Sequence, residues 1–63
     1  LRRTLAAWFR HNVQPLATSK ALFIHRNTLE YRLNRISELT GLDLGNFDDR
    51  LLLYVALQLD EQH

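Results

Sequence analysis

Apolar residues recur along the first part of the chain with a spacing close to one helical turn. Within residues 1–12 they stand at positions i, i+4, i+7 and i+8, which form one face of an amphipathic helix. The polar residues between them would face solvent. The four apolar positions are Leu1, Leu5, Trp8 and Phe9.

A second, shorter helix is predicted over residues 15–23. Pro15 suits its first turn, because the N–H that proline lacks would have no partner there. The small Ser19 would allow this helix to approach the next one closely. The residues expected on its inner side are Leu16, Ser19, Leu22 and Phe23.

The third predicted helix, residues 26–40, has an apolar side and a strongly polar side. Gly41 would end it in a left-handed conformation. Asn27, with Glu30 three residues later, has the form of a capping box, which would start the helix at residue 27 or 28. The inner face would consist of Leu29, Leu33, Ile36 and Thr40.

Residues 47–60 complete the pattern with a nearly continuous apolar run. Asn46 can cap a helix here, and the acidic residues that follow suit the positive end of its dipole. The segment LLLYVALQL could be a buried strand by composition, but no other run could pair with it. We therefore predict an all-α fold, a small bundle of about four helices that contains a helix-turn-helix.

The length of the chain limits it to one domain over residues 1–63. It has no Cys, so neither a disulfide nor a thiolate metal site can stabilise it, and a cytoplasmic location is expected. A start at Leu1, inside a predicted helix, leads us to expect a fragment of a longer protein. No signal peptide and no membrane-spanning run is visible.

Charge is distributed unevenly between the two halves of the chain. Residues 1–35 contain seven basic residues and one acidic residue, whereas residues 36–63 contain one basic and six acidic residues. A basic half is typical of a protein with a polyanionic partner. Packing of the two oppositely charged halves against each other is the other interpretation.

The polar side of the third helix carries the residue types that read nucleic acid. Arg can form paired hydrogen bonds with guanine, Asn with adenine, and Thr or Tyr can bind a phosphate oxygen. A helix-turn-helix consists of a short helix, a tight turn and a longer recognition helix, whose N-terminus carries polar residues of this kind. Phe23 stands where many such motifs have glycine, so the turn cannot rely on a glycine with positive φ, and we expect Phe23 to cover the core.

The segment LFIHRNTLEYRLNRISELTGLDL resembles the C-terminal DNA-binding domain of the PucR-type bacterial regulators. The hallmark of that family is Leu, an aromatic or aliphatic residue, Ile or Val, then H-R-N-T-L, two residues and R-L. Here the hallmark occupies residues 22–33, and the segments TGLDL and DRLLLYVALQL also resemble the family. The resemblance therefore covers nearly the whole chain.

The resemblance implies the DNA-binding end of a transcriptional activator, whose effector-sensing domain lies upstream and is absent here. It also implies a homodimer or higher oligomer in the full-length protein, and a recognition helix that starts at Arg26 with His25 near the cap. We prefer this start to Asn27. Glu30 departs from the family pattern, and pairing with Arg26 or Asn27 is one role for it. The expected DNA-binding residues are Arg26, Asn27, Thr28, Tyr31, Arg35, Arg32 and Lys20.

Other functions find less support in the sequence. The three His residues lack metal-ligand spacing, and the two Gly residues form no phosphate-binding loop, so we expect no enzyme, metal or cofactor. The alternative is a helical dimerisation or docking module without nucleic-acid binding, because residues 51–57 are apolar almost all round the helix. The residues expected at such an interface are Leu52, Leu53, Ala56 and Leu59.

Overall fold

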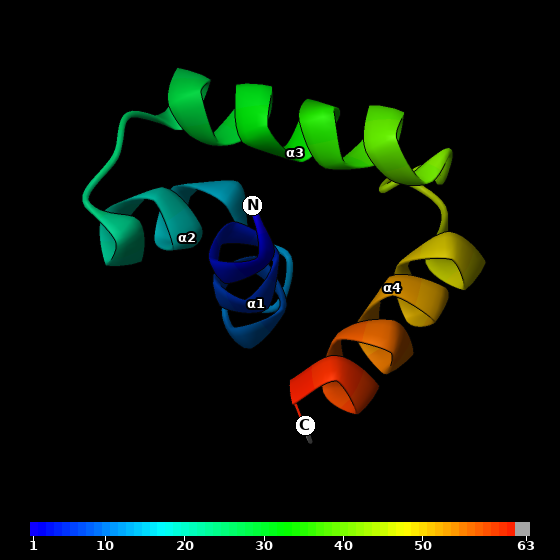
Figure 1. The fold of residues 1–63 in the computed structure, drawn as a ribbon. Helices are drawn as coiled ribbons and strands as arrows, with labels where there is room; N and C mark the ends of the chain where they lie inside the picture. The colour runs from blue at the N-terminus through cyan, green and yellow to red at the C-terminus, as the bar shows by residue number, and fades with distance from the viewer. Residues whose placement is uncertain (62–63) are drawn as a thin grey trace.

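The computed structural model describes residues 1–61 and confirms the all-α fold (Figure 1). Helix α3 lies across α1 and α2, and α4 descends from the far end of α3 (Figure 1). Within the described residues, no helix is long and apolar enough to cross a membrane. The four helices are α1 (Arg2–Arg10), α2 (Pro15–Leu22), α3 (Arg26–Thr40) and α4 (Phe47–Glu61).

Helix α1 ends two residues before the expected residue 12, because the chain reverses there. Asn12 and Val13 both have positive φ, at 57° and 55°. The N–H of Val13 donates to the carbonyl of Trp8 at 2.9 Å, and that of Asn12 to Phe9 at 3.0 Å. This pair of bonds is a Schellman motif, which satisfies carbonyls at the end of a helix. Pro15 then begins α2 at the first helical position, as predicted.

The turn between α2 and α3 uses the same motif at Phe23 and corrects the expectation that Phe23 covers the core. Phe23 adopts the left-handed conformation, with φ 57° and ψ 41°, and its side chain is 95% exposed. The N–H of Ile24 donates to the carbonyl of Ser19 at 3.1 Å. Leu22 and Ile24 are half-buried against the core, so the turn leaves no inward place for Phe23.

The inner side of α2 also differs from the expected one. Ser19 is buried as predicted, but Leu16 is exposed and Thr18 is fully buried. The hydroxyl of Thr18 donates to the carbonyl of Gln14 at 2.7 Å, which removes the cost of burying it. A small side chain with an internal hydrogen bond therefore occupies the place where the sequence suggested a leucine.

The core lies where α3 crosses α1. Leu29 has no exposed surface, and the cluster around it draws on α1, α3 and α4. Thr40, expected on the inner face of α3, is exposed, because it is the last residue of the helix and its hydroxyl donates to the carbonyl of Ile36 at 2.8 Å. The buried cluster consists of Leu5, Trp8, Leu29, Leu33, Ile36, Leu53 and Leu57.

Helix α4 returns the chain to α1. The side chain of Asn46 accepts the N–H of Asp49 at 3.1 Å, which confirms the predicted cap. Leu53 and Leu57 then join the core, and α1 is the helix on which α4 packs. An ion pair of 2.6 Å between Arg2 and Asp60 joins the two ends, but both side chains are well exposed, so it adds little stability.

Replacing Leu29 with Ala should lower the free energy of unfolding by about 2–5 kcal/mol, because it leaves a cavity at the best-buried site. Denaturant unfolding followed by circular dichroism measures this. Leu39 on the same helix is 64% exposed, so Leu39→Ala is the matched control and should change the value by less than about 0.5 kcal/mol. Equal effects of the two changes would contradict the described core.

Candidate nucleic-acid interface

Helix α3 separates its buried residues from a broad polar surface. Leu29, Leu33 and Ile36 face the core, so the side chains on the opposite side of the helix face solvent. Most of them are hydrogen-bonding residues, and they start at the first residue of the helix. The exposed polar and aromatic residues along this surface include Arg26, Asn27, Thr28, Tyr31, Asn34 and Arg35.

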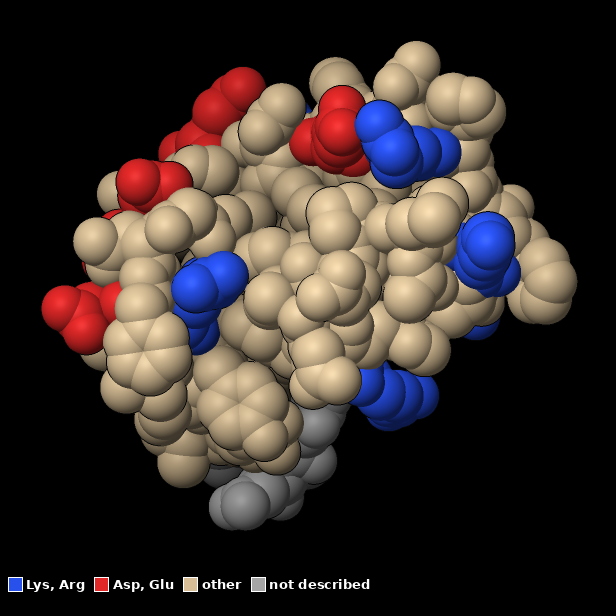
Figure 2. All heavy atoms as spheres, turned by 180° about the vertical axis from the view of Figure 1, so that it is seen from behind, with Lys and Arg blue, Asp and Glu red and all other residues tan. Residues whose placement is uncertain are grey.

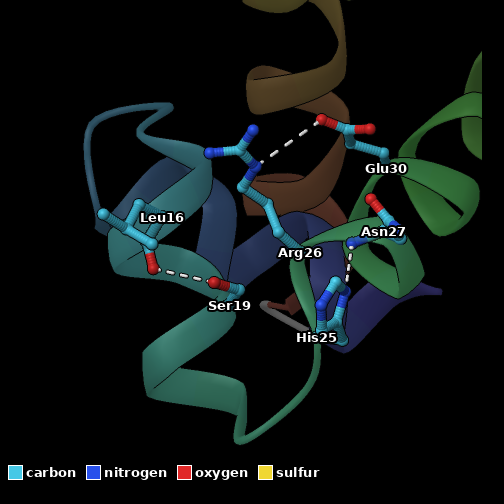
Figure 3. A network of polar contacts seen from close by, with 6 residues as sticks. All are labelled: Leu16, Ser19, His25, Arg26, Asn27 and Glu30. Atoms are coloured by element: carbon cyan, nitrogen blue, oxygen red, sulfur yellow. Dashed lines mark hydrogen bonds and ion pairs between the residues drawn. The ribbon is translucent and has the colours of Figure 1, made fainter.

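The N-terminus of α3 is capped by His25, in agreement with the start that the family resemblance implied. His25 has an extended backbone, with φ −69° and ψ 148°. Its Nδ1 atom accepts the N–H of Asn27 at 3.0 Å, and the ring lies against the first turn (Figure 3). The capping box at Asn27 and Glu30 is therefore wrong, because Asn27 already lies inside the helix. Gly41 ends the helix at φ 72°, as predicted.

Two of the arginines on this surface form ion pairs along the helix. Arg26 Nε lies 4.0 Å from a carboxylate oxygen of Glu30 (Figure 3), which gives Glu30 the local partner considered for it. Arg35 is closer to its partner, with 3.1 Å between its Nη1 atom and Glu38. All four side chains are about half exposed or more, so each pair is worth about 0–1 kcal/mol. Either guanidinium can leave its pair for a stronger anionic partner.

The remaining expected contacts lie outside this surface. Lys20 is exposed in the last turn of α2, at the side of the turn. Arg32 is half-buried on the flank of α3, where it lines a hollow with Arg3 and Leu22. None of the ion pairs among the described residues involves Arg32, so the structure gives no acidic partner for it. The structure thus clusters Arg26, Asn27, Thr28 and Tyr31, with Arg35 further along α3.

The charge asymmetry of the sequence is visible on the surface. In Figure 2, Asp and Glu gather toward one edge of the molecule, and most Lys and Arg lie toward the opposite edge. The backbone N–H of Asp43 donates to a carboxylate oxygen of Asp49 at 2.8 Å and so ties the α3–α4 loop to the start of α4. Two ion pairs join the basic and acidic halves, Arg2 with Asp60 and Arg35 with Glu38, and the other described basic residues of the first half form no ion pair with the acidic half.

Of the four residues predicted to form an interface on α4, the structure contradicts one. Leu53 is buried in the core of the chain itself, so it is not available to a partner. Leu52, Ala56 and Leu59 are exposed on the outer side. Leu51 and Val55 extend the same exposed apolar surface, whereas the ring of Tyr54 packs edge-on against Phe9 of α1. The sequence could not separate this surface from the core because α4 is apolar almost all round.

Comparison with known proteins gives a consistent set of relatives. The model of the PucR C-terminal helix-turn-helix domain matches residues 1–59. The chain is 98% identical over 62 residues, 98% of its length, to the carbohydrate diacid regulator of Escherichia coli (strain K12). It covers 16% of that protein. No solved structure matches the chain significantly.

Two more distant relatives are also named as regulators. The proline-responsive transcriptional activator PutR of Bacillus subtilis (strain 168) is 41% identical over 94% of the chain, which covers 14% of PutR. The transcriptional activator PmfR of Paenarthrobacter nicotinovorans is 43% identical over 92% of the chain, which covers 12% of PmfR. These three relatives are thus named as regulators rather than as enzymes, and the chain spans about a sixth of their length or less.

Proposed function

The chain belongs to the PucR C-terminal helix-turn-helix family, a DNA-binding regulator domain, and from this premise we propose that it reads a specific duplex sequence with α3. The observation that carries the proposal is the exposed N-terminal half of α3. Arg26 and Asn27 stand in its first turn, held by the His25 cap, while Leu29 anchors the same turn in the core. A rigid helix with polar side chains at its N-terminus fits the major groove.

The residues of this surface divide into those that read bases and those that hold the backbone. Arg26 and Asn27 carry forked polar groups that suit guanine and adenine edges. Thr28 and Tyr31 each end in one hydroxyl, which suits a single phosphate oxygen. Arg35, Arg32 and Lys20 provide positive charge for phosphates on either side. The helix dipole of α3 adds to the attraction of phosphate near residue 26.

The role proposed for the full-length regulator rests only on the names of the relatives. Because a relative that is 98% identical is named a carbohydrate diacid regulator, we propose that the parent protein activates genes for the use of sugar diacids. An effector-sensing domain upstream of this chain would control it. A bacterial regulator that binds the chromosome would act in the cytoplasm.

The exposed apolar side of α4 supports a second candidate function. A helical docking module without nucleic-acid binding would use the surface around Leu52, Ala56 and Leu59, which no other described part of the chain covers. Such a module would not need the polar N-terminus of α3. Its binding to random duplex DNA would be absent at any salt concentration.

Phosphate binding is tested by the salt dependence of DNA affinity. Arg10, which is exposed in the last turn of α1, is a further candidate for phosphate binding beside Lys20 and Arg32. Replacing any of the three with Ala should reduce the slope of log affinity against log salt by about 0.9 for each true phosphate contact. Arg50 on α4, beside the acidic edge, is the matched control, and Arg50→Ala should leave the slope unchanged. If the three test variants all keep the wild-type slope, the DNA surface lies elsewhere.

We also propose that two copies act together, because one recognition helix reads too few base pairs for a unique genomic site. Two copies would bind half-sites about 34 Å apart, or a multiple of that distance. Footprints of the full-length regulator should then show two related half-sites. A single half-site without symmetry or repeat would count against pairing.

Sequence reading is tested at two neighbouring residues. Asn27→Ala should cost about 1–3 kcal/mol on the cognate duplex and relax preference at one base pair. Tyr31→Phe should weaken cognate and scrambled duplexes alike by about 1 kcal/mol, the value of one hydrogen bond. Both affinities are measured by titration, with circular dichroism to show that folding is intact. A preserved cognate-to-scrambled ratio in both Asn27→Ala and Arg26→Ala would rule out this N-terminus as the reading surface.

A further inference from the structure

The hydrogen bond that caps α3 assigns a different role to each nitrogen of the His25 ring. Its Nδ1 atom accepts the N–H of Asn27 at 3.0 Å, so this nitrogen carries no proton. In a neutral imidazole the proton then resides on Nε2, which becomes a donor. An imidazolium ring has no acceptor and could not form this cap. The capped helix therefore presents a ring with one acceptor turned inward and one donor on its far side.

The donor side of the ring is available to a partner. His25 is exposed, and none of the hydrogen bonds among the described residues involves Nε2. The ring stands at the start of α3, beside Asn27 and apart from the pair of Arg26 and Glu30 (Figure 3). A donor at this position is exposed to solvent at the N-terminus of α3, next to the polar side chains of its first turn.

We propose that His25 is a two-sided positioning residue, which holds the first turn of α3 through Nδ1 and donates from Nε2 to a DNA phosphate. The inference rests on the proposed function, since it names a contact within the same interface. A neutral N–H at the positive end of a helix dipole suits a phosphate oxygen. This single contact with the DNA backbone would then set how deeply Arg26 and Asn27 enter the groove toward the bases.

Phosphate is favoured over a base edge by the chemistry of the ring. The base contacts that discriminate best use a forked group such as a guanidinium or amide, whereas His25 offers a single donor once Nδ1 is occupied. A neutral donor also displaces no condensed cation from DNA. Its loss should therefore weaken binding without changing the salt dependence, unlike the loss of a lysine or arginine.

Matched variants at pH 8 can distinguish the capping role of Nδ1 from the donor role of Nε2. His25→Asn retains an acceptor for the N–H of Asn27 but lacks a donor at the place of Nε2. His25→Ala lacks both. Thermal unfolding by circular dichroism reports the cap. Affinities for a duplex selected from a random pool and for a scrambled duplex, each over a range of salt, report the phosphate contact.

We expect His25→Asn to unfold at the wild-type temperature and His25→Ala at a lower one. His25→Asn should bind both duplexes about tenfold more weakly than the wild type, the effect of losing one hydrogen bond to a charged oxygen. Its cognate-to-scrambled affinity ratio and its salt slope should be unchanged. His25→Ala should lose further affinity and also part of the cognate-to-scrambled ratio, because the first turn is no longer held.

Three results would overturn the inference. Wild-type affinity in His25→Asn would show that the ring acts only as a cap. A salt slope reduced by about 0.9 would show that the ring binds as a cation. Equal unfolding temperatures of His25→Ala and His25→Asn would remove the capping role. A wild-type chain that binds neither duplex would instead overturn the proposed function, and this inference with it.

Discussion

The burial of one side of α3 is the constraint from which the rest of the structure follows. Leu29 has no exposed surface, and Leu33 and Ile36 continue its row against the core. Because each residue advances the helix by about 100°, fixing this row also fixes which side chains face outward. Stability and the proposed DNA surface therefore depend on opposite sides of the same helix. A change that rotated α3 to improve its packing would turn Arg26 and Asn27 away from a ligand.

The sequence predicted those parts of the fold in which one local rule acts alone. Three signals each allowed a single structural interpretation, and the structure agrees with all three. They are the helical spacing of Leu29, Leu33 and Ile36, the proline at the start of α2 and the glycine after α3. The start of α3 had two local candidates, because both Asn27 and His25 can accept a backbone N–H. Local preference favoured Asn27, and the family resemblance correctly favoured His25.

Where local preference and tertiary packing conflict, the sequence was a poorer guide. A left-handed conformation costs a residue with a side chain about 1–2 kcal/mol, so the rule expects glycine rather than Phe23. The close approach of α2 and α3 nevertheless requires that conformation, and an exposed phenyl group is the result. On α4, Leu52 and Leu53 are chemically the same, and only packing against α1 decides which one is buried. The DNA contacts themselves remain predictions, since exposure shows which side chains can reach a ligand without ranking them.

The return of α4 to α1 has a consequence for the order in which the chain folds. Helices α1, α2 and α3 pack on one another within residues 1–40, whereas α4 packs on α1 at the opposite end of the chain, where Arg2 meets Asp60. Contacts between near neighbours close short loops and form early, while this one must close almost the whole chain. We therefore expect the helix-turn-helix to assemble first and α4 to dock last. The transition state would then hold a formed recognition helix before the two ends of the chain have met.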